Sequence, residues 1–274
     1  LEKHGHECKI AYGRMAVPSK YEKYAIRIGN NFTNKVDAAI SRYFSNSGFN
    51  SKIPTIQLIS NIKKFNPDLI HLHNIHSSYI NDKILFKFLK KYNKPVIWTL
   101  HDCWAYTGFC AYFSNICCDK WKTGCEECPI LKGKKRLDSS KKLYTLKKEL
   151  FTSLDNLTLI TPSIWLADIT KQSFLGNYNI FPIQNGIDLQ VFKPTKSNFR
   201  QKYGLENKKI ILGVASAWVE YKGLKEFAAL AKNLESEYKV VMVGLTEEQA
   251  KTLPKEILTL PRTHSVEELA EIYT

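Results

Sequence analysis

The stretch PVIWTLHD, residues 95–102, joins a short apolar run to two polar residues. Apolar runs of roughly four to eight residues next to a turn residue such as proline are typical of strands buried in a parallel sheet. Ligands of open α/β sheets bind beyond the carboxyl ends of the strands. The stretch therefore predicts a buried strand at 95–100 and ligand contacts at His101 and Asp102. The pair could hydrogen-bond hydroxyl groups of a ligand, or Asp102 could fix the tautomer of the His101 imidazole. The structural alternative is a pair that anchors the loop.

The preceding stretch DLIHLH, residues 68–73, has the same organisation. It predicts a second strand, with His73 and Asn74 at its carboxyl end and a polar loop after them. His71 and His73 point to one face of such a strand. One of the two could therefore be a core histidine whose hydrogen bonds are made within the protein, and this is the alternative to a ligand contact at His73.

Strands and helices alternate along the first two thirds of the chain. Apolar residues at helical spacing lie between the apolar runs, Pro54 is placed to open one helix, and Ser163 is placed to cap another. This alternation is typical of a parallel sheet with helices on both faces, an α/β fold. The expected strands are 8–12, 68–73, 95–100, 157–161 and 179–184, and the expected helices are 31–44, 54–65, 80–89, 143–154 and 164–174.

A second α/β series follows a polar segment at 192–203. It predicts strands at 209–215, 238–243 and 257–260, and helices at 223–234, 247–253 and from residue 266 onward. We therefore expect two Rossmann-like domains, at 1–193 and 194–274. The first contains a cysteine-rich insertion at about 103–130, and the second is incomplete.

The composition describes a basic protein with packed cores. Apolar residues make up 44% of the 274 residues, and the formal net charge is +14. This composition argues against disorder, and no apolar run approaches the length of a membrane span. The positive charge attracts anions such as phosphorylated substrates, lipid headgroups or nucleic acid, although a solvated lysine-rich surface gives the same total.

A strand that runs into small residues predicts a phosphate site in the second series. Residues 213–216 read GVAS, and Lys222 and Gly223 follow at a predicted helix start. Free N–H groups near Ser216 and Gly223 and the helix dipole favour phosphate, and Lys222 adds a full charge. No GxGxxG or Walker A motif is present. A solvated lysine on a turn is the alternative.

Taken together, these motifs resemble those of glycosyltransferase family 4, enzymes with the GT-B fold, in which two Rossmann-like domains face a cleft. The resemblance extends over nearly the whole chain. The motifs that carry it are Gly5-His6-Glu7 and residues 67–73, 99–102, 161–163, 185–192 and 222–224.

The resemblance implies retaining transfer of a sugar from a nucleotide diphosphate sugar, without a catalytic cofactor. It places Lys222 at the diphosphate, His101 beside the donor sugar, and Asp102, His73 and Asn74 in the cleft near the acceptor. The acceptor expected is a glycan or a lipid-linked molecule in cell-surface polysaccharide or glycolipid synthesis. We expect a hexosyltransferase in the cytoplasm, peripheral on the inner face of the plasma membrane.

The sequence departs from the family pattern in three places. The family usually has an arginine five residues before the diphosphate lysine, where this chain has Ala217. The glycine-rich loop of the family would precede Leu1, and its paired glutamates would follow Thr274. We therefore expect a fragment that is inactive by itself, cut from an active parent protein.

Six of the seven cysteines lie between residues 103 and 128. Cys125 and Cys128 have the spacing of a zinc knuckle or a redox pair, and the flanking Gly124 and Pro129 favour a turn. Zinc, disulfides and free thiols all remain open. The resemblance selects one set of four for a structural zinc, and leaves Cys103 and Cys117 outside it. That set is Cys110, Cys118, Cys125 and Cys128.

The basic run that follows, between Lys132 and Lys142, could rest on an anionic membrane that presents the acceptor. A solvated helix face explains it equally well.

Two other functions are alternatives. A non-catalytic nucleotide-sugar-binding protein is consistent with Ala217. A basic zinc-containing nucleic-acid-binding protein accounts for charge and cysteines, but it explains neither α/β series, and aromatic residues are not interleaved with the basic run. We therefore expect no nucleic-acid partner.

Overall fold

The computed structural model describes residues 2–14 and 16–274, and the chain divides into two units, Leu1–Asn185 and Gly186–Thr274. Both units are α/β, and every sheet in the described residues is parallel, which confirms the predicted fold class. We expected the division after residue 193. The units divide instead between Asn185 and Gly186, within a stretch, residues 183–190, that is exposed throughout.

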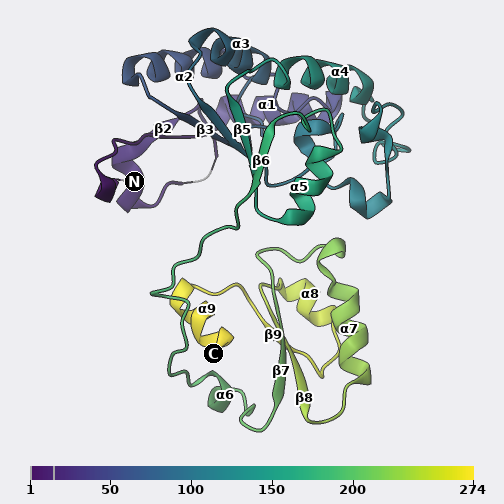
Figure 1. Ribbon diagram of the computed structural model, residues 1–274. Helices are drawn as coiled ribbons and strands as arrows, with labels where there is room; N and C mark the ends of the chain where they lie inside the picture. The colour runs from purple at the N-terminus through teal and green to yellow at the C-terminus, as the bar shows by residue number, and fades with distance from the viewer. Residues whose placement is uncertain (1, 15) are drawn as a thin grey trace. The chain divides into compact units, whose positions relative to one another are not determined.

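The main sheet of unit 1 has the strand order β3-β4-β5-β6. Its strands alternate with helices, of which α2, α3 and α4 form a row along the sheet while α5 packs on β5 and β6 (Figure 1). The strands are β3 (Ile70–His73), β4 (Val96–Thr99), β5 (Leu157–Thr161) and β6 (Asn179–Pro182). The helices are α2 (Lys52–Phe65), α3 (Asp82–Tyr92), α4 (Ser140–Phe151) and α5 (Ile164–Lys171).

The core of unit 1 lies between β4, β5 and the row of helices. Val96 and Trp98 of β4 and Leu159 of β5 are buried, and the rings of Trp98 and Phe86 both contact Phe151 of α4. The apolar run 95–100 is therefore a central strand that is covered by helices, as its composition predicts.

Two helix starts test the predicted capping. Ser163 caps α5 as expected, because its Oγ accepts a hydrogen bond from the N–H of Leu166 at 3.2 Å. The expected start of α2 at Pro54 is wrong. The carbonyl of Ser51 already accepts from the N–H of Thr55 at 3.2 Å, so the helix begins at Lys52. Pro54 is tolerated within the first turn, where helical N–H groups have no intrahelical partner.

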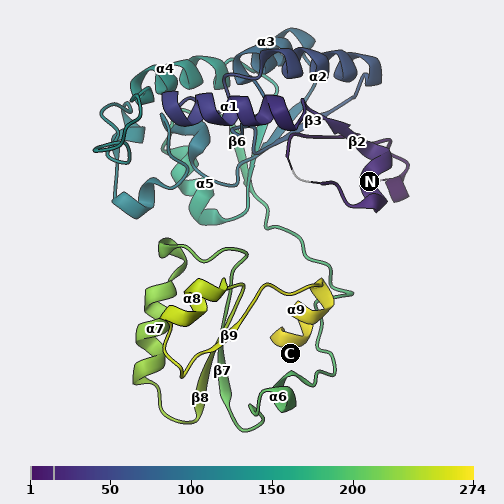
Figure 2. The ribbon, with the colours of Figure 1, turned by 180° about the vertical axis from the view of Figure 1, so that it is seen from behind.

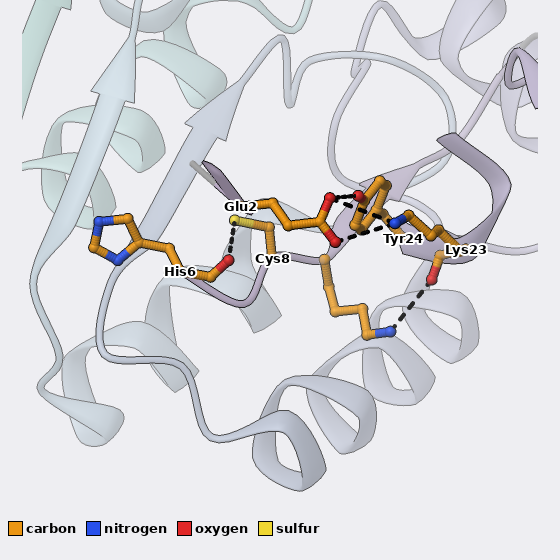
Figure 3. A network of polar contacts seen from close by, with 6 residues as sticks. Glu2, His6, Cys8, Lys23 and Tyr24 are labelled. Carbon is orange, nitrogen blue, oxygen red and sulfur yellow. Dashed lines mark hydrogen bonds and ion pairs between the residues drawn. The ribbon is translucent and has the colours of Figure 1, made fainter. Parts of the chain in front are cut away.

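The N-terminal part of unit 1 holds a small parallel sheet, β1 (Ile10–Tyr12) with β2 (Ala25–Arg27), followed by α1 (Asn31–Phe44). The sequence did not predict β2. Figure 3 shows the carboxylate of Glu2 accepting from Lys23 at 3.0 Å and from the Tyr24 hydroxyl, which ties residues before β1 to residues before β2. The ring of His6 points away from this network.

Residues 103–130 form no α-helix or strand. Three short 3-10 helices lie in this segment, which is held by packed aromatic rings of Tyr106, Phe113 and Trp121. Nowhere in the part of the chain that the structure describes is a helix both long enough and apolar enough to cross a membrane.

Unit 2 has a three-stranded sheet of order β7-β8-β9. Two glycines, one in β7 and one directly after β8, lie where neighbouring atoms leave no room for a side chain. A Cβ on Gly213 would lie 2.8 Å from the ring of Phe227, and one on Gly244, whose φ is +92°, would lie 1.8 Å from the Ala215 carbonyl oxygen. The strands are β7 (Lys209–Val214), β8 (Tyr238–Val243) and β9 (Leu258–Leu260), and the helices are α6 (Phe199–Lys202), α7 (Leu224–Asn233), α8 (Glu247–Thr252) and α9 (Val266–Tyr273).

Candidate active site

Three histidines gather where β3 and β4 end. Because the register pairs His73 with Thr99, the end of β3 lies beside His101 in the loop after β4. His73 Nδ1 lies 3.1 Å from His101 Nε2, and the rings of His71 and His73 are 4.2 Å apart. His71 Nε2 in turn lies 2.8 Å from Thr99 Oγ1. The structure thus joins His73 and His101, which are 28 residues apart in the sequence, in one hydrogen bond.

Two imidazoles of this cluster, those of His71 and His73, disfavour protonation. Partial burial, then the neighbouring His71 and His101, lowers the pKa of His73 to about 4. Partial burial and His101 also lower the pKa of His71. Both rings are therefore neutral at pH 7, and each can offer one N–H donor and one acceptor nitrogen. Two such neutral rings suit hydrogen bonds to hydroxyl groups, which need donors and acceptors together.

Asp102 contacts His76 and the backbone of its own loop. Its Oδ1 accepts from the N–H of Trp104 at 2.9 Å, and its Oδ2 lies 3.4 Å from His76 Nε2. The ring of His76 also packs on Trp104, with ring centres 5.2 Å apart. Asp102 therefore anchors the loop that carries His101, and the structure supports the anchoring alternative for this residue more directly than a ligand contact.

A small pocket lies beside the cluster. Asn74, His101 and Asp102 all line it, so three of the four predicted residues of unit 1 share one depression. Asn74 adopts φ +35°, and its carbonyl accepts from the Tyr79 hydroxyl at 2.9 Å. This strained turn brings Asn74 beside the loop after β4, where it shares the pocket with His101 and Asp102.

Lys147 is the residue of this site that the sequence analysis missed. It lies on the buried face of α4, fully enclosed beneath the loop after β4. Its ammonium donates to the carbonyls of Trp104 at 2.8 Å and Thr107 at 3.0 Å, and lies 3.4 Å from the centre of the Trp104 ring. The signal was present, because Lys147 falls four residues after Leu143 and three before Leu150, in the apolar stripe of the helix.

Asp82, at the start of α3, is the acid whose charge acts most strongly on Lys147. Asp82 is fully buried, and neither carboxylate oxygen has a hydrogen-bond partner within the described residues. Burial raises the pKa of Asp82 well above its ordinary value and lowers the pKa of Lys147 to about 7. The charge of each residue opposes this shift, because it stabilises the charged form of the other. The buried ammonium of Lys147 therefore supports the loop that carries His101, and Asp82 is the buried acid of opposite charge.

The predicted phosphate loop in unit 2 is open to solvent. Lys222 ends a short 3-10 helix and is exposed, and Gly223 adopts φ +82° at the start of α7. Lys222 makes no ion pair with any residue that the structure describes. Ser216 and Ala217 are exposed in the same loop. The geometry leaves Lys222 available to an anion, and Ala217 adds no charge to it.

The four selected cysteines are neighbours. Burial, and then the thiols of Cys128 and Cys125, raise the pKa of Cys110 to about 12, and Cys118 interacts with each of the other three thiols. Cys117 is instead exposed, with its thiol 3.8 Å from the carbonyl of Ser114. Four soft sulfur donors suit zinc. Among the described residues, however, no three His, Cys, Asp or Glu side chains are spaced to hold a metal ion.

Comparison with known proteins gives a consistent family. The family model described as Glycosyltransferase Family 4 matches residues 1–191. A protein of Escherichia coli K12 described as the colanic acid biosynthesis glycosyl transferase WcaC is 31% identical over 186 residues, which is 65% of this chain. The chain spans 45% of the length of WcaC.

Solved structures share the fold at low sequence identity. A glycosyltransferase from Rickettsia africae superimposes with a TM-score of 0.56 at 15% identity, over 99% of this chain and 63% of the other. Anabaena Alr3699/HepE, solved in complex with UDP-glucose, gives a TM-score of 0.50 at 14% identity, over 92% of this chain and 64% of the other. The fold of the chain is thus that of GT-B glycosyltransferases.

Proposed function

Because the chain belongs to glycosyltransferase family 4, we propose that its protein transfers a sugar, with retention of configuration, from a nucleotide diphosphate sugar to a glycan or a lipid-linked acceptor. The observation that carries the proposal is the histidine cluster at the carboxyl edge of the unit 1 sheet, joined by the bond between His73 and His101. The described function of WcaC and the UDP-glucose bound to HepE support polysaccharide synthesis and a nucleotide-sugar donor.

Each predicted residue has a role that its surroundings allow. His101 contacts the donor sugar, and His73 fixes the His101 ring through the 3.1 Å bond. Asn74 lines the same pocket as His101, and we assign it to the acceptor. Lys222 binds the diphosphate as an exposed cation, with backbone N–H groups near Ser216 and Gly223 beside it. Asp102 holds the loop and is a positioning residue.

This division of labour suits retaining transfer. The leaving diphosphate can accept the proton of the attacking hydroxyl, so the protein needs no strong base of its own. It supplies orientation and stabilises the charge that develops on the diphosphate. The histidine cluster and one exposed lysine meet those two needs.

The test measures nucleoside diphosphate release by the full-length protein from a panel of nucleotide sugars. We expect release from one donor, reduced on the order of 100-fold or more by Lys222→Ala. Lys225→Ala is the matched control, because Lys225 lies one turn away and pairs with Glu220 at 2.9 Å. Donor binding without turnover, with or without an acceptor extract, would instead favour a non-catalytic binding protein, which the uncharged Ala217 would suit.

A structural zinc is the second part of the proposal, and it requires the four thiols to draw together, because no three such side chains among the described residues are spaced to hold a metal ion. Cys110, Cys118, Cys125 and Cys128 would hold it, and it would order a segment that has no α-helix or strand of its own. Elemental analysis of protein purified without a metal-affinity tag should find one zinc per chain. Cys125→Ser should lose it and Cys117→Ser should keep it. Zinc well below one per chain in the unmutated protein excludes the site.

The nucleotide sugar also implies a location. Nucleotide sugars are normally cytosolic, so we place the protein on the cytoplasmic side, at the inner face of the membrane where a lipid-linked acceptor is presented.

A further inference from the structure

The helix α1 exposes its apolar side. Its apolar residues recur at the spacing of one helix face, which ordinarily packs against a core. Here Phe32 is 74% exposed and Tyr43 is 57% exposed, while the buried residues of the helix are Asn34, Asp37 and Ser41. We define the α1 patch as the six exposed apolar residues on this helix and beside its end. They are Phe32, Val36, Ile40, Tyr43, Phe44 and Leu137.

Specific hydrogen bonds fix this orientation. The buried carboxylate of Asp37 accepts from Ser41 Oγ at 2.8 Å, from Asn50 Nδ2 at 3.2 Å and from Ser51 Oγ. Asn34 also donates to the carbonyl of Gly13. Rolling the helix to bury its apolar side would break these bonds and leave Asp37 without partners. The polar side of α1 is therefore the side that docks onto the unit.

The basic run that follows the cysteine-rich segment is bonded to the end of this helix. The N–H of Leu137 donates to the carbonyl of Tyr43 at 3.1 Å, and Ser139 Oγ donates to the carbonyl of Phe44 at 2.8 Å. Figure 2 shows α1 on the near side of unit 1 with the cysteine-rich segment beside its end. Two stretches almost 100 residues apart thus form one surface, apolar along α1 and basic beyond it.

Unpaired positive charge borders the α1 patch. Lys35 and Arg42 lie on α1 to one side of the apolar stripe, and Lys132, Lys134 and Lys135 precede Leu137. None of these five makes an ion pair with a residue described by the structure. The acids nearby are engaged elsewhere. Asp138 accepts from the N–H groups of Cys128 and Ser140, and Glu126 pairs with Lys141.

We propose that the α1 patch inserts into the interfacial region of an anionic lipid bilayer, with the surrounding lysines and arginine on the headgroups. An amphipathic helix with a basic margin binds such surfaces by burying its apolar side and attracting anionic lipid. A second copy of the chain is a poorer occupant, because it would bring two basic margins together. This proposal rests on the proposed function in one respect, that membrane binding would bring the site to a lipid-linked acceptor.

The experiment is co-sedimentation of the full-length protein with vesicles of phosphatidylglycerol and phosphatidylcholine, and with phosphatidylcholine alone, without any sugar. We expect binding only to the anionic vesicles. Phe32→Ser should weaken that binding about tenfold. Phe181→Ser, which removes another exposed phenylalanine, on β6, should leave it unchanged. Circular dichroism confirms that each variant is folded.

A second pair of variants tests the charge. Lys134→Glu with Lys135→Glu should abolish the dependence on anionic lipid. Lys251→Glu with Lys255→Glu changes the net charge equally on exposed residues of unit 2 and should not. Equal loss in both pairs, or no difference between Phe32→Ser and Phe181→Ser, overturns the proposal.

Absence of vesicle binding also overturns the proposal, and light scattering then identifies the occupant. A dimer that Phe32→Ser dissociates would assign the α1 patch to a second copy. Neither result touches the glycosyltransferase proposal, since donor turnover is measured separately without membranes.

Discussion

The loop after β4 in unit 1 and the loop after β7 in unit 2 both follow the carboxyl end of a parallel strand, but they are held differently. The loop after β4 rests on the buried ammonium of Lys147, which donates to two of its carbonyls. The loop after β7 is held by close backbone packing and by Trp218, whose Nε1 donates to the carbonyl of Val243 at 2.9 Å. The first loop is therefore sensitive to lost charge, and the second to added volume.

Lys147→Met tests the first half of this comparison and should have the largest effect on stability. The methionine keeps most of the packing, but it leaves the carbonyls of Trp104 and Thr107 without their donor and Asp82 without its counter-charge. We expect a loss of about 3–5 kcal/mol in the free energy of unfolding, measured with urea. Lys148→Met, at the exposed neighbouring position, should change it by less than about 0.5 kcal/mol. Equal effects of the two would show that Lys147 does not support the loop.

Gly244→Ala tests the second half. The added Cβ would meet the Ala215 carbonyl oxygen at 1.8 Å, and φ is +92°, so the backbone of the loop after β7 must move. We expect a loss of about 2–4 kcal/mol in the free energy of unfolding. Gly186→Ala is the control, because a Cβ there meets nothing within 4 Å. A stable Gly244→Ala variant with unchanged donor binding would contradict the account of this loop.

Acid titration tests the smallest effect, in the histidine cluster. The pKa of folded His73, about 4, lies below the 6.5 of a free histidine, so the unfolded chain takes up protons first as pH falls. Stability present at pH 7 is therefore lost between about pH 6.5 and pH 4. Because solvent reaches these rings, we expect a loss on the order of 1 kcal/mol.

His73→Gln should flatten this part of the stability curve, and His264→Gln, which removes an exposed histidine of unit 2, is the control. A curve for His73→Gln that matches the unmutated protein would mean that the cluster is protonated like free histidine.

The same comparison shows what the sequence could predict. Periodicity fixed α1 at its observed bounds, Asn31–Phe44, and β5 and β8 at theirs, because each pattern is local. The alternation of apolar runs also predicted that His73 and His101 each lie at the carboxyl end of a strand. Local sequence patterns were enough to predict an element wherever a residue's position along that element decides its environment.

Contacts between distant segments were beyond such patterns. The outward turn of the α1 patch depends on Asp37 finding Asn50 and Ser51, and β2 depends on pairing with β1. Lys147 was overlooked because a lysine in a basic stretch is ordinarily solvated, and only the fold places it under the loop after β4. In each case a buried polar partner, distant in sequence or in an unexpected environment, decides the outcome.

The most direct test of the central claim compares donor turnover by the full-length protein with that of His101→Ala and Lys222→Ala in one assay. The account predicts that His101→Ala lowers kcat with little change in KM for the donor, whereas Lys222→Ala lowers kcat/KM further by weakening the hold on the diphosphate. Both variants should unfold at the same urea concentration as the unmutated protein. Turnover that survives unchanged in both would contradict the assignment of these loops to sugar transfer.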